Sequence, residues 1–234
     1  MTLEVLYVDN HVLAVAKPAG EPVVPDESGD TSLLDRAREW VRVEFEKPGN
    51  VFLGVVHRLD RPVSGVVALA RTSKGAARLT AAFRDHTAQK TYLGLLPKTP
   101  REPAGELVQW LAKDAARNHV SVVPAHTPGA REAVTRWRVV VPSGAGAGSA
   151  GLCVVELEPR TGRSHQLRLA CRTLCAPLLG DLRYGASAPL ADASIGLHAW
   201  QLRVQHPTRD EALHFVAPLP ALSVWDTARA ALTQ

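Results

Sequence analysis

The sequence predicts an α+β fold, in which strands follow one another in runs and a few helices interrupt them. Three observations lead to this prediction. Short apolar runs of strand length recur between turn residues, and a few longer segments repeat apolar residues with helical spacing. In addition, 46% of the 234 residues are hydrophobic, which is enough for a substantial core. We therefore expect a single domain over residues 1–234.

The chain is predicted to begin with a hairpin that is followed by a helix. Residues 4–8 and 12–16 are apolar runs separated by a polar tripeptide, which is typical of two paired strands. Thr31 is the predicted N-cap of a helix that runs to about Glu46. The apolar residues at helical spacing form its expected buried stripe: Leu33, Leu34, Ala37, Val41 and Phe45.

Two strands with a turn between them are expected next. Residues 51–56 are predicted to form a strand that delivers His57 and Asp60 to the end of a sheet. Residues 65–70 are predicted to form the strand that leaves this turn. Asp60 is therefore expected on a turn between strands.

The rest of the chain continues the same pattern. Ser73 can cap a helix that runs to about Asp85, and the strand that carries Tyr92 follows it. Later strands are expected at about 107–112, 119–124, 132–141, 152–157, 198–204 and 213–216. The small residues of 143–151 predict a hairpin loop, because strand-like sequence resumes directly after them. Two more helices are expected, at about 164–174 and from Pro220 onward.

The composition narrows the possible function classes. The formal charge of +4 and the pI near 9.2 suit a polyanionic partner, because Lys and Arg supply most non-specific affinity for nucleic acids. Six of the 27 basic residues are lysines, so 21 are arginines, whose planar guanidinium suits phosphate contacts and base stacking. A GC-rich genome would produce the same arginine bias.

No apolar run approaches about 18 residues and the start lacks signal-peptide features, so we expect a cytoplasmic protein without a membrane segment.

The cysteines give no sign of a metal site. Cys153, Cys171 and Cys175 are few and odd in number, which suits a reducing compartment better than a disulfide scaffold. Cys171 and Cys175 are four residues apart on a predicted helix. Because no second Cys or His pair has ligand spacing, core packing is favoured and we predict no metal.

Residues 57–65 (HRLDRPVSG) carry the clearest sign of chemistry, because they place Asp60 between Arg58 and Arg61 on a turn. An aspartate has an ordinary pKa of about 3.9, so at neutral pH it is an anion that can act as a nucleophile without a separate base. Neighbouring cations lower such a pKa and keep the carboxylate charged in a site that excludes water. The alternative is an ion pair that only fastens the turn.

Two further segments favour a chemical role for Asp60 over a structural ion pair. Residues 88–96 (AQKTYLGLL) form a predicted strand with Lys90 and Tyr92 on the same face. Residues 158–169 (EPRTGRSHQLRL) form a glycine turn that opens a helix. Because the helix dipole opposes a cation at this end, Arg163 serves something other than helix stability, and a carboxylate partner would relieve the conflict.

Together the three segments resemble the RluA-type family of pseudouridine synthases, whose sequences carry HRLD-x-x-(S/T)-G, K-x-Y and G-R-(S/T)-H-Q-(L/I)-R in this order. The resemblance continues in four shorter motifs and spans nearly the whole chain: 16–20 (AKPAG), 180–185 (GDLRYG), 197–199 (LHA) and 215–220 (FVAPLP). It implies a mixed, largely antiparallel β-sheet with flanking helices and a central RNA-binding cleft. It also implies an enzyme that isomerises uridine to pseudouridine in structured RNA, without a cofactor.

The resemblance also implies roles for individual residues. Asp60 would attack the ribose carbon or assist elimination to a glycal, Tyr92 would stack on the uracil, and Arg163 would pair with Asp60. Arg58 resembles the family arginine that contacts phosphate near the flipped nucleotide or fills its vacated place. The other expected RNA-binding residues are His57, Lys17, Lys90, His165, Leu167 and Arg168. Among these, Leu167 would line the base pocket, and His57 would orient the turn.

The resemblance is not complete. Relatives usually continue Q-(L/I)-R-V-H after the third motif, whereas Leu169-Ala170-Cys171 stands here without the histidine, which puts local packing or substrate fit in question. The chain begins directly at the catalytic pattern. We therefore expect a stand-alone monomer without an N-terminal S4-like domain or an obligate protein partner, whose partner is ribosomal or transfer RNA.

Three alternatives remain open at this point. A non-catalytic RNA-binding module would keep the cleft and lose the chemistry. A carboxylate-based nucleosidase would need a second acid, for which Glu156, Glu158 or Asp181 are candidates, although none falls in a recognisable pairing. His57 and His165 could suggest a hydrolase, but no Gly-x-Ser-x-Gly or cysteine nucleophile motif accompanies them.

Overall fold

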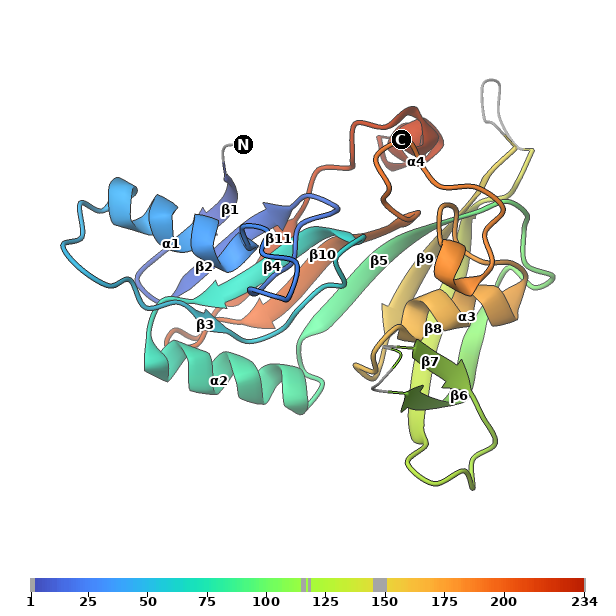
Figure 1. Cartoon of the computed structure of the whole chain (residues 1–234), viewed down its shortest axis with the longest axis horizontal. Helices are drawn as coiled ribbons and strands as arrows, with labels where there is room; N and C mark the ends of the chain where they lie inside the picture. The colour runs from blue at the N-terminus through green and yellow to red at the C-terminus, as the bar shows by residue number, and fades with distance from the viewer. Residues whose placement is uncertain (1–2, 115–116, 118, 145–150, 234) are drawn as a thin grey trace. The chain divides into compact units, whose positions relative to one another are not determined.

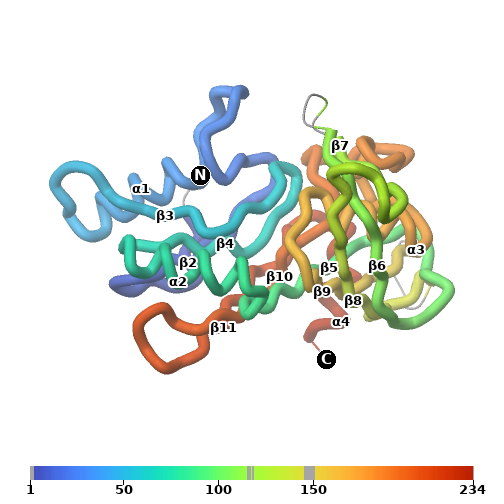
Figure 2. Tube along the Cα trace, turned by 90° about the horizontal axis from the view of Figure 1, so that it is seen from below, coloured from blue at the N-terminus to red at the C-terminus, as the bar shows by residue number. Residues whose placement is uncertain are grey.

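The computed structural model describes residues 3–114, 117, 119–144 and 151–233, which form two compact units (Figures 1 and 2). The first unit comprises residues 1–90 and 199–218, and the second comprises residues 91–198 and 219–234. Each unit is a sheet with helices, which confirms the predicted α+β class. The helices of the described residues are all too short or too polar to span a bilayer.

The first unit contains the strands β1 (Glu4–Val8), β2 (Val12–Lys17), β3 (Gly54–Val55), β4 (Ser64–Ala70), β10 (Leu197–Gln205, from Ala199 onward) and β11 (Ala212–Val216). Their order is β1-β2-β4-β10-β11, and β3 also pairs with β4. The β1–β2 hairpin is confirmed, and β2 and β4 run antiparallel. Every residue of β4 is buried, as expected for a continuous apolar strand with both faces covered.

The structure corrects two boundaries in this unit. The predicted strand 51–56 is limited to the two residues of β3, so the irregular segment before Asp60 is longer than expected. The second helix, α2 (Ser73–Arg84), has Thr72 rather than Ser73 as its N-cap, because the Thr72 hydroxyl accepts from the Gly75 amide at 3.1 Å. Helix α2 lies against β3 and β4 and inserts Leu79 into the core of the unit.

The first helix, α1 (Leu33–Glu44), begins one residue later than predicted because Ser32 is its N-cap. The Ser32 hydroxyl accepts from the Asp35 amide at 3.2 Å, and the Asp35 carboxylate accepts from the Ser32 amide, so the two residues form a capping box. The stripe from Leu33 to Val41 is buried as predicted. Phe45 was wrongly assigned to it, because the helix ends before it and its side chain is 41% exposed.

The capping box gives a direct test of this boundary. Replacement of Ser32 by alanine is expected to lower the free energy of unfolding by about 1 kcal/mol, because the Asp35 amide loses its acceptor. Replacement of Thr31 by alanine serves as the control and is expected to change it by less than about 0.5 kcal/mol. Urea denaturation measures both, and a larger loss for the Thr31 variant would contradict the assignment.

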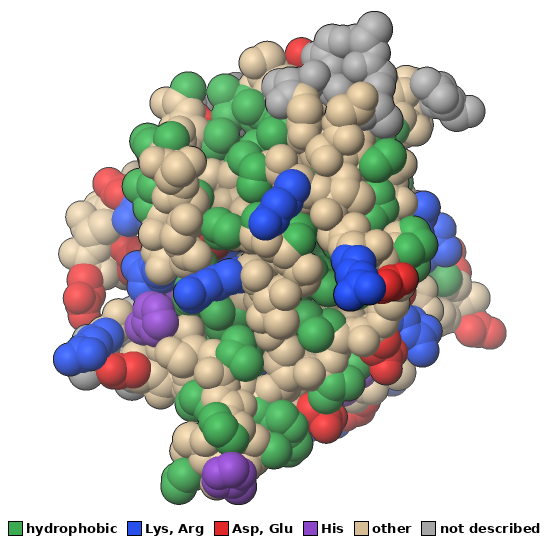
Figure 3. Space-filling view, turned by 90° about the vertical axis from the view of Figure 1, so that its right-hand side faces the viewer, with side chains coloured by type: hydrophobic (Ala, Val, Ile, Leu, Met, Phe, Trp, Pro, Cys, Tyr) green, Lys and Arg blue, Asp and Glu red, His purple; other side chains and the backbone are tan. Residues whose placement is uncertain are grey.

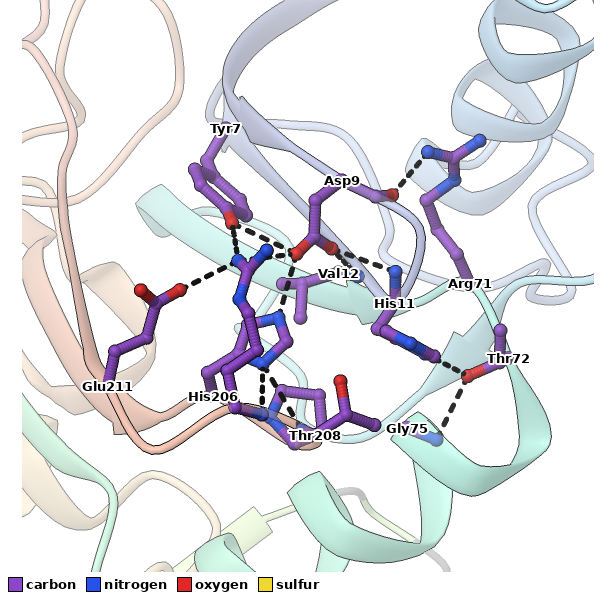
Figure 4. A network of polar contacts seen from close by, with 12 residues as sticks. Tyr7, Asp9, His11, Val12, Arg71, Thr72, Gly75, His206, Thr208 and Glu211 are labelled. Carbon is purple, nitrogen blue, oxygen red and sulfur yellow. Dashed lines mark hydrogen bonds and ion pairs between the residues drawn. The ribbon is translucent and has the colours of Figure 1, made fainter.

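Asp9 joins the β1–β2 turn to the β10–β11 hairpin (Figure 4). Its Oδ1 accepts from the amides of His11 and Val12 at 2.8 and 2.7 Å, and its Oδ2 accepts from His206 Nε2 at 2.7 Å and Arg209 at 2.8 Å. Burial raises the pKa of Asp9, but these hydrogen bonds outweigh it and lower the pKa to about 2. The network therefore holds the hairpin of the later segment, residues 199–218, against the first hairpin of the chain.

The second unit contains the strands β5 (Gln89–Leu96, from Thr91 onward), β6 (Ala104–Asp114), β7 (His119–Val122), β8 (Arg131–Val141) and β9 (Cys153–Pro159). They are ordered β5-β9-β8-β6-β7, and each of these pairs runs antiparallel. The predicted loop 143–151 falls largely outside the described residues, but β8 and β9 on either side of it pair as a hairpin would.

The helices of this unit are α3 (Gln166–Leu174) and α4 (Asp226–Leu232), with short 3-10 turns η1 (Leu182–Tyr184) and η2 (Ser223–Trp225). Helix α3 lies against β6, β8 and β9. The last helix starts later than the predicted Pro220, at Asp226, because the chain first forms the 3-10 turn η2.

Candidate active site

Asp60 lies where the sequence predicted it, in the irregular segment between β3 and β4. Its carbonyl accepts from the Val63 amide at 3.0 Å, which closes the turn. Leu59 and Val63 on either side are buried at 8% and 3% exposure, while Asp60 itself is half-buried. Two apolar anchors therefore present one carboxylate on a short, fixed turn.

The glycine that ends this motif is required by close packing. Gly65 has φ +122°, and a Cβ at this position would lie 2.2 Å from the carbonyl oxygen of Ala199 on β10. No larger side chain fits there without a shift of the backbone. The contact explains why the sequence has a glycine after the Asp60 turn.

Lys17 and Arg61 fasten the Asp60 turn to residues 17–21. The Lys17 ammonium donates to the carbonyls of Pro18 and Glu21 at 2.8 Å each and to that of Arg61 at 3.1 Å. The Arg61 carbonyl also accepts from the Gly20 amide at 2.8 Å, and the Arg61 Nε donates to the Gly20 carbonyl at 2.8 Å. Lys17 is only 2% exposed, so its observed role is to position the turn from inside the protein.

Burial lowers the pKa of Lys17 to about 8, although the carboxylates of Glu21 and Asp60 oppose this shift. Between pH 8 and about 10.5 the unfolded chain binds more protons at this residue than the folded chain does, so stability rises with pH in that window. We expect the wild type to gain about 2 kcal/mol relative to Lys17→Met between pH 7 and 9.5. Urea denaturation at several pH values measures this difference.

An NMR titration of the Lys17 side chain checks the same prediction without a variant. A midpoint near 8 is expected, because burial disfavours the charged ammonium. A midpoint near the ordinary lysine pKa of about 10.4 would contradict the prediction.

His57 is held against β4. Its Nε2 accepts from the Ala68 amide at 2.9 Å, and its ring stacks on Phe83 with a centroid distance of 4.3 Å. Burial and, to a smaller extent, Lys90 lower the pKa of His57 to about 3, so the imidazole is neutral and its proton is on Nδ1. These contacts hold His57 in place, and its role in orienting the turn stays a prediction.

Lys90 and Tyr92 are on β5 as predicted. Burial lowers the pKa of Lys90, and Tyr92 is half-buried and pairs with Leu157 of β9. Arg58, the other cation of the Asp60 turn, is exposed. An exposed arginine beside the carboxylate can contact phosphate, whereas a half-buried tyrosine can offer its ring to a base.

The third motif forms the turn before α3. Arg163 is half-buried, and its Nε donates to the Glu132 carbonyl at 2.9 Å. His165 is the N-cap residue of α3, with the left-handed φ of +53°, and it makes no capping hydrogen bond. Its Nδ1 lies 2.5 Å from the hydroxyl of Tyr184, which belongs to η1.

Arg168 is inside the second unit. It is 5% exposed and makes a two-fold ion pair with the fully buried Asp181, at 2.8 Å from Nε and 2.6 Å from an NH2 group. Its guanidinium also lies 4.9 Å from the centroid of the Tyr184 ring. The motif 180–185 thus supplies a carboxylate and an aromatic ring that hold this arginine. The motif was recognised in the sequence, but these two roles were not predicted, because Asp181 and Tyr184 are 13 and 16 residues from Arg168 in the chain.

The neighbouring apolar positions are part of the core. Leu167 is 7% exposed, and Cys171 is fully buried, so burial raises the pKa of its thiol. Cys153 is also buried, and the three cysteines are free thiols. Within the described part of the chain, His, Cys, Asp and Glu side chains do not gather in groups of three that could hold a metal ion.

The site residues are divided between the two units. Asp60, Lys17, His57 and Arg58 belong to the first unit, in which Lys17 binds the Asp60 turn through the Arg61 carbonyl and lies near the Asp60 carboxylate. Tyr92, Arg163, His165 and Arg168 belong to the second unit. The expected meeting of Asp60 with Tyr92 and Arg163 stays a prediction.

Comparisons with known proteins agree on one family. Residues 11–173 match the family described as RNA pseudouridylate synthase. Ribosomal large subunit pseudouridine synthase D of Zymomonas mobilis is 31% identical over 228 residues, which cover 93% of this chain and 69% of the relative. The tRNA pseudouridine synthase C of Vibrio cholerae is 30% identical over 236 residues, which cover 95% of this chain and 93% of the relative.

A solved structure extends this agreement to the fold. The human RNA pseudouridylate synthase domain containing 4 matches 97% of this chain and 92% of its own, with a TM-score of 0.77 and 25% identity. The curated relatives differ in length, and this chain spans 55% of one and 93% of another. Because the family match covers more than half of the chain and includes the Asp60 turn, β5 and the turn before α3, the chain belongs to the RNA pseudouridylate synthase family.

Proposed function

We propose that this chain isomerises uridine to pseudouridine in structured RNA and that Asp60 is its nucleophile. One observation carries the proposal. Asp60 lies on a turn that hydrogen bonds of Lys17 and Arg61 hold against residues 17–21. A carboxylate on such a turn can act as a nucleophile without a separate base. A turn that is held in place also removes part of the entropic barrier to the reaction.

The reaction conserves all atoms of the nucleoside. The bond between N1 of uracil and C1′ of the ribose breaks, the base turns while it is retained, and C5 bonds to C1′. The proton leaves C5 and N1 gains one. Asp60 either bonds to C1′ and is later displaced, or removes a proton from C2′ to give a glycal, in which case a proton returns to C2′ when C5 bonds to C1′. In either route Tyr92 stacks on the extruded uracil, which offsets the cost of unstacking by about 1–3 kcal/mol.

Arg163 is the proposed partner of Asp60, and Arg168 competes for this role. Arg163 is half-buried, with its backbone and Nε bonded to neighbouring residues. Arg168 is more rigidly held, because Asp181 binds it through two hydrogen bonds. Loss of turnover in Arg163→Gln supports the first assignment. Normal turnover in that variant, with loss in Arg168→Lys, would move the role to Arg168, since lysine lacks the planar fork.

RNA contacts outside the base pocket are proposed for Arg58, Lys90 and His165, and Leu167 is proposed to line the base pocket. Arg58 is exposed and is the best placed of these to contact phosphate. Charged side chains of both signs are dispersed over the face of the molecule shown in Figure 3. Several arginines of the second unit are paired with acids, such as Arg136 with Glu106 and Arg138 with Glu156. The count of 27 basic residues therefore overstates the positive surface that RNA would meet.

We further propose that the chain acts as a cytoplasmic monomer with RNA as its partner and without a cofactor. Its relatives named above are enzymes of ribosomal or transfer RNA, which supports both RNA classes as substrates. Light scattering on the purified protein tests the monomer. A mass of two chains in the absence of RNA would contradict it.

A tritium-release assay tests the function. The purified chain is incubated with transfer RNA and with ribosomal RNA fragments that carry 5-tritiated uridine. Release of tritium without free uracil is expected, together with pseudouridine in the digested RNA. Release of free uracil would favour a nucleosidase. RNA binding without tritium release from either RNA class would favour a non-catalytic module.

A further inference from the structure

The first residue of α3, Gln166, uses the full hydrogen-bonding capacity of its side chain. It is 4% exposed. Its Oε1 accepts from the Arg163 amide at 3.0 Å and from the Thr161 hydroxyl at 2.7 Å. Its Nε2 donates to the Val134 carbonyl at 2.9 Å and to the Thr135 hydroxyl at 3.0 Å. A primary amide offers two donors and a carbonyl oxygen that accepts two bonds, so the group is fully satisfied.

These bonds connect the turn before α3 to β8 at the point where the β8–β9 ladder ends. The last paired residues of that ladder are Thr135 and Pro159. Beyond them, the Arg160 amide donates to the Val134 carbonyl at 2.8 Å, and the Val134 amide donates to the Thr161 hydroxyl at 3.0 Å. Gln166 therefore replaces the missing ladder with side-chain hydrogen bonds, and it holds the turn that carries Arg163.

We propose that Gln166 is a positioning residue of the reaction. It fixes the backbone of Arg163 on one side and the start of α3, which carries Leu167 and Arg168, on the other. The left-handed backbone of His165 lies between these points, and such a conformation persists only where its surroundings impose it. This proposal rests on the proposed function, and it holds whichever of the two arginines accompanies Asp60.

The chemistry of the amide explains why another residue would not serve. Leucine has a similar volume but leaves the Arg163 amide and the Val134 carbonyl without their side-chain partner. Glutamate keeps the acceptor for Arg163 and Thr161, but its anion cannot donate to Val134 or Thr135. A protonated glutamate regains one donor. The glutamate variant is therefore expected to recover activity as the pH falls.

The chain offers a matched control in Gln109 on β6. This glutamine is 6% exposed, belongs to the same unit, and donates to the Thr173 hydroxyl at 2.8 Å. Its partner Thr173 is near the end of α3, away from the turn before this helix, and Gln109 is outside the proposed machinery. Gln109→Leu thus removes a buried amide of the same kind without touching residues 160–166.

The experiment compares kcat, KM and RNA affinity for the wild type, Gln166→Leu, Gln166→Glu and Gln109→Leu. We expect Gln166→Leu to lose on the order of 100-fold in kcat, with the Kd for RNA changed by less than about threefold, because misplacement affects the reacting geometry more than binding. Gln109→Leu is expected to keep kcat within about threefold. The ratio of Gln166→Glu to wild-type activity is expected to rise as the pH falls from 8 to 5.5.

Hydrogen exchange of the Arg163 amide adds a readout that does not depend on activity. It is expected to quicken in Gln166→Leu and to stay unchanged in Gln109→Leu. Unchanged kcat or unchanged exchange in Gln166→Leu overturns the proposal, as does an equal loss of kcat in Gln109→Leu. If Gln166→Leu does not fold, the pH response of Gln166→Glu decides. An inactive wild type refutes the proposed function, whereas the exchange measurement still judges whether Gln166 holds Arg163.

Discussion

Replacement of Asp60 by asparagine is expected to abolish pseudouridine formation while RNA binding is retained. Asparagine keeps the volume of the side chain and the turn that Val63 closes, but it removes the anion that attacks or assists elimination. We expect kcat to fall by at least about 10³-fold, as for other variants that lose a nucleophile. The Kd for RNA is expected to stay the same or to decrease slightly, because one negative charge near a polyanion is removed.

The tritium-release assay measures turnover of this variant, and filter binding measures its affinity for RNA. Asp85→Asn is the matched control, because Asp85 follows α2 in the same unit and is paired with Arg84 on the surface. It is expected to retain wild-type activity. Asparagine can deamidate to aspartate, so Asp60→Ala is assayed in parallel. Near-normal turnover in both Asp60 variants would remove Asp60 from the chemistry and leave the turn with a structural role only.

The sequence was sufficient for features that depend on local pattern. The β1–β2 hairpin and the buried strand β4 follow from the apolar runs that the turn residues separate. Helix starts were less accurate, since Thr31 and Ser32 are both good capping residues, as are Thr72 and Ser73. Only the backbone conformation of the cap decides between such neighbours.

The candidate site was predictable to a similar extent. The Asp60 turn was found because its motif is contiguous. The functions of Lys17 and Arg168 were less apparent, because their partners come from other segments. Lys17 reaches the carbonyl of Arg61, 44 residues away, and Arg168 binds Asp181. A lysine or arginine in a basic chain suggests RNA, and only the fold reveals that these two cations are directed into the protein.

The Arg168–Asp181 pair is expected to make the largest single contribution to stability among the residues discussed here. Asp181 has no exposed surface and Arg168 is 5% exposed, so the loss of the carboxylate charge removes a two-fold ion pair from a site that solvent does not reach. Asp181→Asn is expected to lower the free energy of unfolding by about 3–5 kcal/mol. Urea denaturation followed by tryptophan fluorescence measures it, since Trp137 and Trp225 of the same unit are buried.

The control for this prediction is an exposed pair with similarly short contacts. Glu39 and Arg42 of α1 are joined at 2.6 Å, but both side chains are more than half exposed. Solvent already screens them, so Glu39→Gln is expected to leave stability unchanged within error. A cost below about 1 kcal/mol for Asp181→Asn would show that the Arg168 charge is compensated by another group. In that case, burial of the pair would not determine how much stability the carboxylate of the motif 180–185 provides.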